Sequence, residues 1–112
     1  MALVINTSKP AALLTEIKKA IDDNKVETWS YDSDGDFTHT PDQWKYQAWL
    51  RPVVAPGVLI FGLVGKTDIQ MTKLIYGVYH GRFIEMLLTH FDNEFSAASA
   101  TAQKDSQVDI FK

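Results

Sequence analysis

The spacing of apolar residues changes twice along this chain, and that change constrains the fold more than any single motif does. Apolar residues recur at helical spacing from Leu13 to Ile21, alternate with polar ones from Val26 to His80, and return to helical spacing from Ile84 to Ala102. A repeat near 3.6 is typical of an amphipathic helix, and a repeat of two is typical of a half-buried strand. The sequence therefore predicts a helix, an antiparallel meander and a second helix.

The first helix is expected from a cap at Ser8 to a stop near Asn24, with Pro10 in its first turn, where a missing N–H costs little. The short apolar run Leu3–Ile5 adds an edge strand ahead of it. The second helix is expected at Gly81–Ala102, long enough to cross a small sheet.

The meander between the helices is divided by turn residues such as Asp34-Gly35, a pair that supplies the positive φ angles of tight hairpins. We expect strands at Val26–Tyr31, Asp36–Thr40, Lys45–Arg51, Val58–Val64 and Leu74–His80. Residues 45–51 also fit a helix, because Thr40 to Gln43 matches a capping box, and the sequence leaves this open. The segment 58–64 is apolar on both faces and is expected to be a central strand.

The fold class that follows is α+β: a two-layer sandwich of four to five antiparallel strands, in the order α-β-β-β-β-α, with both helices packed on one face. The chain has 112 residues, which fits one domain, and we place that domain at residues 1–102. Residues 103–112 are mostly polar and are expected to fray.

Composition excludes several classes of protein. The chain has no Cys, which excludes a disulfide scaffold and a thiolate nucleophile. A net charge of −3 argues against a nucleic-acid partner, because such proteins neutralise phosphates with clustered cations. The longest uncharged stretch, Pro52–Gly65, is about half of a bilayer span, and the apolar run at 2–5 is too short for a secretory signal. We expect a cytoplasmic protein with no membrane partner, no cofactor and no metal.

The second sheet face is the first candidate site, because two helices on one face leave the other without a cover. Alternation places on it an aromatic set with one cation, which is typical of a contact centre: Trp29, Tyr31, Trp49, Phe61 and Arg51. A monomer rarely exposes so large an apolar patch, so the sequence predicts a homodimer or another protein partner. A register error of one residue would exchange the two faces and make these residues the core.

The second candidate is a strand-to-helix corner, where backbone N–H groups and nearby side chains converge on an anion. Six residues form this expected site: His80, Gly81, Arg82, Glu85, His39 and Asp36. Phosphate or carboxylate would suit it, for binding or for general acid and base work. The alternative is a structural corner with a local ion pair between Arg82 and Glu85.

The third candidate is the acidic cluster Asp32, Asp34 and Asp36. A helix-loop-helix calcium site is excluded, because glycine is fourth in this run and Gln43 stands where the bidentate Glu is needed. A weaker divalent-cation site and a solvated turn remain as readings. Seven of the 14 acidic residues lie between Asp22 and Asp42, which favours a basic partner.

Other motifs fail on spacing. Gly65-Lys66-Thr67 lacks the earlier glycine of a phosphate-binding loop, since position 60 is Ile60. His90 and Glu94 share a helix face, but a zinc site needs further ligands from elsewhere in the fold. The sequence contains no Gly-x-Ser-x-Gly nucleophile turn. It leaves open whether the protein is an enzyme.

Overall fold

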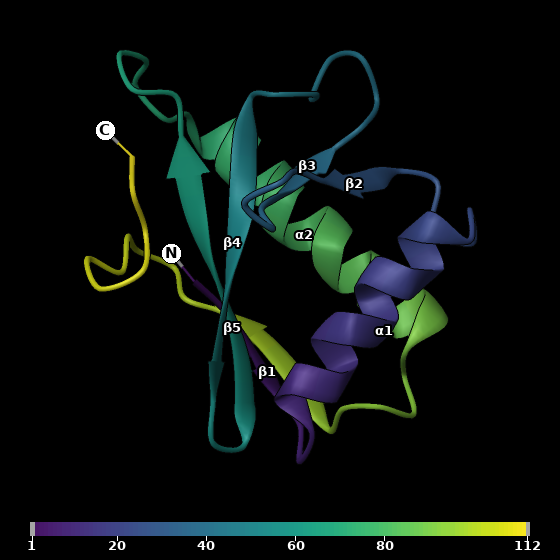
Figure 1. The fold of residues 1–112 in the computed structure, drawn as a ribbon. Helices are drawn as coiled ribbons and strands as arrows, with labels where there is room; N and C mark the ends of the chain where they lie inside the picture. Colours follow the sequence, from purple (N-terminus) through teal and green to yellow (C-terminus); the bar gives the residue numbers. More distant parts are fainter. Residues whose placement is uncertain (1, 112) are drawn as a thin grey trace.

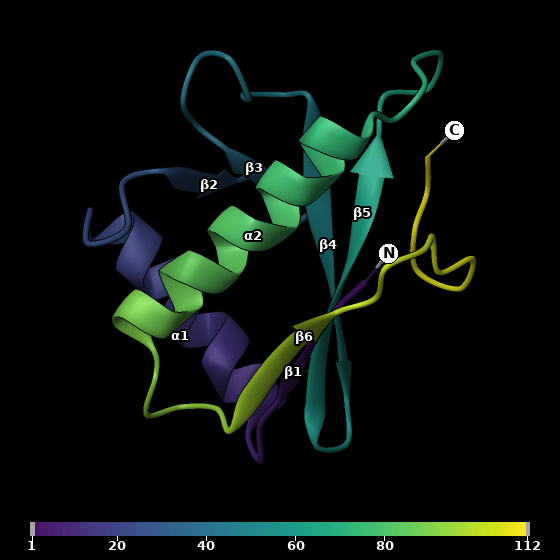
Figure 2. The same ribbon diagram turned by 180° about the vertical axis from the view of Figure 1, so that it is seen from behind.

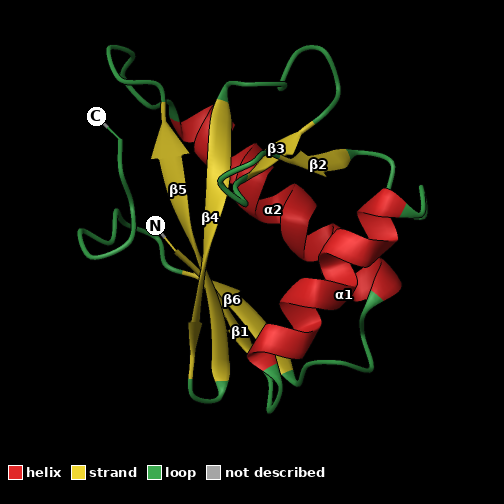
Figure 3. Ribbon diagram, viewed as in Figure 1, coloured by secondary structure: helices red, strands yellow, loops and turns green. Residues whose placement is uncertain are grey.

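The protein folds into a twisted antiparallel sheet with two helices on one side of it (Figures 1, 2 and 3). This computed structural model describes residues 2–111. The helices are α1 (Pro10–Asp22) and α2 (Lys73–His90). The strands are β1 (Ala2–Asn6), β2 (Trp29–Tyr31), β3 (Phe37–His39), β4 (Ala48–Ala55), β5 (Val58–Gly65) and β6 (Ala97–Ala100). Their order across the sheet is β2-β3-β4-β5-β1-β6, and every neighbouring pair is antiparallel.

The α+β class with an antiparallel sheet is confirmed, but the expected order of elements is wrong in three places. β1 is not an edge strand, because it pairs with β5 on one side and with β6 on the other. The expected strand 74–80 is instead the first half of α2. The helix expected at 81–102 ends at His90, and residues 97–100 form β6.

Helix α1 forms where the sequence predicts it, but its N-cap is Lys9, without a side-chain hydrogen bond, and not the expected Ser8. Pro10 is its first residue, and Leu13 and Ile17 are its buried side chains, one turn apart. Asn24, just beyond its end, has a φ of 60°, the left-handed conformation that asparagine tolerates at a helix stop.

Two hairpins, β2–β3 and β4–β5, form four adjacent strands of the sheet, with β2 at its edge. β2 and β3 are joined across Asp32 and Asp36, and Gly35 has a φ of 83° in the turn. β4 and β5 are joined by Pro56-Gly57, where Gly57 has a φ of 75°. The open question about residues 45–51 is resolved, since β4 begins at Ala48 after an irregular turn.

β4 continues through Pro52, which the sequence placed outside any strand. β3 pairs with β4 at Leu50, and beyond that residue β4 has no neighbour on that side among the described strands. Pro52 has no N–H to offer to a neighbouring strand, so this half-edge position accommodates it.

Large side chains recur at helical spacing along α2. In the first turns of the helix, apolar residues also alternate as they would in a strand. Thr72 caps the helix, with its hydroxyl accepting from the Ile75 N–H at 3.1 Å. The buried positions fall at intervals of three and four along the helix: Tyr76, Tyr79, His80, Phe83, Met86 and Leu87. They face the sheet, where Phe83 packs against Phe37 and Phe61. Neither helix of the described chain has the length and apolar character needed to cross a bilayer.

The C-terminal segment lies against β5, although the sequence predicts a frayed tail. Asp109 is buried, and its carboxylate accepts from the backbone N–H of Leu63 at 2.8 Å and from that of Asp105 at 2.7 Å. Ile110 forms a parallel bridge with Val64. Val108 lies so close to Gly62 that a Cβ there would stand 2.0 Å from the Val108 carbonyl oxygen. Glycine is therefore the only residue type at position 62 that allows the segment to lie this close to β5.

Candidate functional site

The first candidate region is a cleft between β3 and the second half of α2, with a volume of about 400 Å³. Three residues of the expected anion site line it, namely His39, Arg82 and Glu85. The remaining lining residues are Thr28, Pro41, Gln43, Trp44, Met86, Thr89 and His90.

His39 is a buried histidine with a fixed orientation, only 5% exposed. Its ring stacks on Trp29, with centroids 4.5 Å apart, and its Nδ1 lies 2.7 Å from the Thr28 carbonyl oxygen. Because a carbonyl only accepts, Nδ1 donates, and in the neutral ring Nε2 is left as an acceptor. Burial lowers the pKa of His39 below its ordinary 6.5, and the Arg82 charge lowers it further, while the Thr28 carbonyl and Glu85 oppose the shift. His39 is therefore uncharged at neutral pH.

Arg82 and Glu85 form a loose ion pair at the rim of the cleft. Arg82 Nη1 lies 3.4 Å from Glu85 Oε1, and their side chains are 57% and 66% exposed. An exposed pair of this kind contributes little stability, so either group can turn toward a ligand at small cost. The local ion pair that the sequence offered as an alternative is present.

The other three residues of the expected anion site lie elsewhere, because no strand-to-helix corner forms at residues 80–81. His80 is buried inside α2, where its Nδ1 lies 2.6 Å from the Tyr76 carbonyl oxygen and its ring stacks on Tyr76. Gly81 faces outward on the same helix, with nothing within 4 Å of the position of a Cβ. Asp36 pairs with Arg51 on β4. These residues have structural surroundings, and the cleft does not include them.

Seven of the ten residues that line the cleft were not predicted as part of this site, although the sequence holds a signal for some of them. Arg82, Glu85, Met86, Thr89 and His90 recur at intervals of three and four on one side of α2, as the buried stripe does. Thr28, Gln43 and Trp44 could not be found in this way, since tertiary folding alone brings them to the helix.

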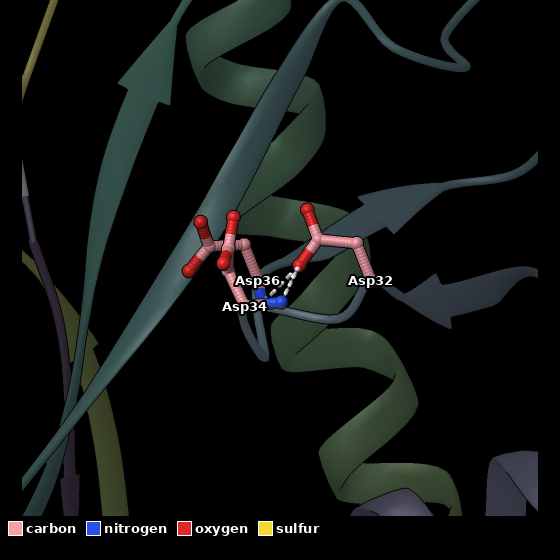
Figure 4. A group of neighbouring side chains, drawn as sticks. All are labelled: Asp32, Asp34 and Asp36. Atoms are coloured by element: carbon pink, nitrogen blue, oxygen red, sulfur yellow. Dashed lines mark hydrogen bonds between the residues drawn. The ribbon is translucent and has the colours of Figure 1, made fainter.

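The second candidate region is the acidic cluster in the β2–β3 turn (Figure 4). Carboxylate oxygens of Asp32, Asp34 and Asp36 lie within 4.8 Å of one another. Asp32 Oδ1 accepts from the backbone N–H groups of Asp34 and Asp36, both at 3.0 Å, which is the usual role of aspartate in a turn.

Arg51 supplies the positive charge that this cluster needs. Its Nε and Nη2 donate to the two oxygens of Asp36, at 3.1 and 2.8 Å, in a bidentate pair. Asp36 is 5% exposed, so most of its carboxylate is already engaged by protein groups. The cluster is explained as a turn with its own counter-ion, which favours the solvated-turn reading over a divalent cation.

The third candidate region is the sheet face turned away from the helices, here called the open face. Strand register places on it six apolar side chains, all half-buried or exposed: Val4, Trp49, Val53, Val58, Ile60 and Val64. Both ribbon views show the two helices on the opposite side of β4 and β5 (Figures 1 and 2). The C-terminal segment reaches part of this face, where Val108 lies over Gly62.

The aromatic set expected on this face is divided between the two faces of the sheet. Trp29 and Phe61 are buried in the core, at 2% and 0% exposure, so they are removed from the contact set. Tyr31 packs beside Phe37 and its hydroxyl donates to Asp22. Trp49 and Arg51 alternate with the buried Ala48 and Leu50, and therefore lie on the open face. The reversal of faces that the sequence left open thus holds for three of the five residues, Trp29, Tyr31 and Phe61.

Comparison with known proteins gives no further guide, since no family model, no curated protein and no solved structure matches this chain.

Proposed function

We propose that this protein is a cytoplasmic interaction module that self-associates through the open face. The proposal rests on one observation: both faces of the sheet carry apolar side chains, but the helices cover only one of these faces. Val53 is 41% exposed at the centre of the strand pair, and its register partner Ile60 is half-buried beside it. Contiguous apolar surface of this kind is typical of contact sites.

Charge at the margins of the open face favours a second copy as the occupant. The acidic turn at residues 32–36 flanks one margin, where Arg51 contacts it, and Lys66 and Lys104 lie beside Val64 and Ile110 past the opposite margin. A two-fold axis parallel to the strands places the acidic margin of one protomer opposite the basic margin of the other. A symmetric dimer of this kind uses the same patch twice.

Sedimentation of the wild-type chain and two variants tests the proposal. Val53→Asp introduces a charge on the open face, and we expect it to weaken self-association at least about tenfold, since desolvating an unpaired carboxylate is costly. Val54→Asp is the matched control, because Val54 is the next residue on β4, is 47% exposed and points to the other side. It should leave association unchanged.

Two results would contradict self-association. One is a wild-type chain that stays monomeric at about 100 μM, far above the concentrations at which specific dimers form. The other is an equal effect of Val53→Asp and Val54→Asp. A monomer that captures a basic protein through residues 32–36 would assign the acidic turn to a different partner and also overturn this proposal.

A further inference from the structure

The cleft between β3 and α2 has a chemistry that self-association does not use. Its rim carries one cation and one anion, its wall carries the neutral acceptor of His39, and apolar side chains complete the lining. We propose that this cleft binds a small zwitterion, an α-amino acid with an apolar side chain. The proposal does not depend on the open face, because the cleft lies on the helix side of the sheet.

The rim selects a ligand that carries both charges. A plain anion would be attracted by Arg82 but repelled by Glu85, whose carboxylate lies 3.4 Å from the guanidinium. A plain cation would be attracted by Glu85 but repelled by Arg82. A zwitterion satisfies both groups, with its carboxylate on Arg82 and its ammonium group near Glu85, so the rim discriminates against ligands of one charge. This differs from the simple anion that the sequence predicts.

His39 supplies a second partner for the ammonium group. Its Nδ1 is committed to the Thr28 carbonyl, so Nε2 is the nitrogen that can accept from a ligand N–H. The ring is 95% buried by its stacking on Trp29 and its edge contact with Tyr79, and within the described chain no donor is hydrogen-bonded to Nε2. Because His39 lines the cleft, a ligand N–H in the cleft can donate to Nε2.

Apolar side chains beside these polar groups provide a place for an aliphatic side chain. Pro41, Trp44 and Met86 line the same cleft, and Met86 is 5% exposed. A volume of about 400 Å³ is at the small end of ligand sites, which suits a molecule the size of an amino acid.

Calorimetric titration with L-leucine and two truncated analogues tests the charge requirement. Isocaproate keeps the carboxylate and the side chain but has no ammonium group, and isoamylamine keeps the ammonium group but has no carboxylate. We expect leucine to bind at least about tenfold more tightly than either analogue, because each analogue leaves one rim charge without a partner. Equal affinity for leucine and isocaproate would overturn the zwitterion proposal, as would the absence of heat with leucine at about 10 mM.

Variants of the rim identify the cleft as the place where leucine binds. Arg82→Gln and Glu85→Gln remove one charge each from exposed positions, and each should lower leucine affinity about tenfold. Lys19→Gln and Glu16→Gln remove the same charges from exposed positions on α1 and should leave affinity unchanged. If the α1 variants lower affinity as much as the α2 variants do, or if the α2 variants have no effect, the cleft is not the site.

Discussion

Two tryptophans of this chain lie on opposite faces of the same sheet and have different surroundings. Trp29 is enclosed by His39, Tyr79 and Phe83, with ring centroids 4.5, 5.6 and 4.9 Å away. Trp49 lies on β4 between two buried residues and faces outward, half-buried. The same residue type therefore lies in the core in one position and on the open face in the other.

Replacing each tryptophan by alanine separates these two roles. Trp29→Ala leaves a cavity between β2 and α2, and we expect it to lower the free energy of unfolding by about 4 kcal/mol. Trp49→Ala should lower it by less than about 2 kcal/mol, because the side chain already contacts water. Urea denaturation of both variants, in a buffer that keeps the chain monomeric, measures the difference. Equal losses of unfolding free energy in the two variants would contradict the placement of Trp29 in the core and of Trp49 on the open face.

Three of the residues that the sequence predicts for an anion site, His39, Arg82 and Glu85, lie together in the cleft. The prediction fails for His80, because the apparent strand Leu74–His80 contains both spacings at once. Leu74, Tyr76, Val78 and His80 alternate, while Tyr76, Tyr79, His80 and Phe83 keep helical intervals. The cap at Thr72 and the continued stripe decide for the helix, and both were visible in the sequence.

At the scale of elements, α1, the β2–β3 hairpin and β5 could be predicted because local signals agree with the final fold. β6 could not. Its sequence Ala97–Ala100 has high helix propensity, yet its backbone pairs with β1, so tertiary contact overrides local preference. β1 was recognised as a strand, but its central position follows from pairing with β5 and β6, which no local pattern specifies.

The C-terminal segment is attached to β5 by the Asp109 carboxylate and by backbone hydrogen bonds of Ile110. Asp109→Ala removes the acceptor of the Leu63 N–H and leaves a buried donor without a partner, so we expect the free energy of unfolding to fall by about 2 kcal/mol. Hydrogen exchange at the Leu63 amide should accelerate as the segment detaches. Asp105→Ala is the control, because its carboxylate accepts from Gln107 within the same segment. An unchanged Leu63 exchange rate in Asp109→Ala would show that Asp109 does not hold the segment.

At the scale of the whole molecule, buried His39 makes stability depend on pH. Burial is the largest cause of its lowered pKa. Between the ordinary value of 6.5 and the lower folded value, the unfolded chain binds a proton at His39 and the folded chain does not. Stability should therefore fall as pH falls through this window. Asp109 acts in the opposite sense nearer its ordinary 3.8, because burial raises its pKa and protonation then favours the folded state.

Urea denaturation from pH 7.5 to 5.5 measures the contribution of His39. In His39→Asn the amide can still donate to Thr28, and we expect fewer protons to be taken up on unfolding in this range. His90→Asn changes an exposed histidine of the same cleft and should alter the pH dependence much less. If the two variants have the same pH dependence, His39 does not carry the effect.

The central place of β1 also has a consequence for synthesis. Leu3 pairs with Phe61 on one side and with Ala100 on the other, so β1, which is synthesised before β5 and β6, gains its last partner only when residue 100 has emerged. Until then β1 presents an unpaired backbone edge and the buried side chains Leu3 and Ile5. Contacts so distant in sequence slow folding and expose apolar surface in the meantime.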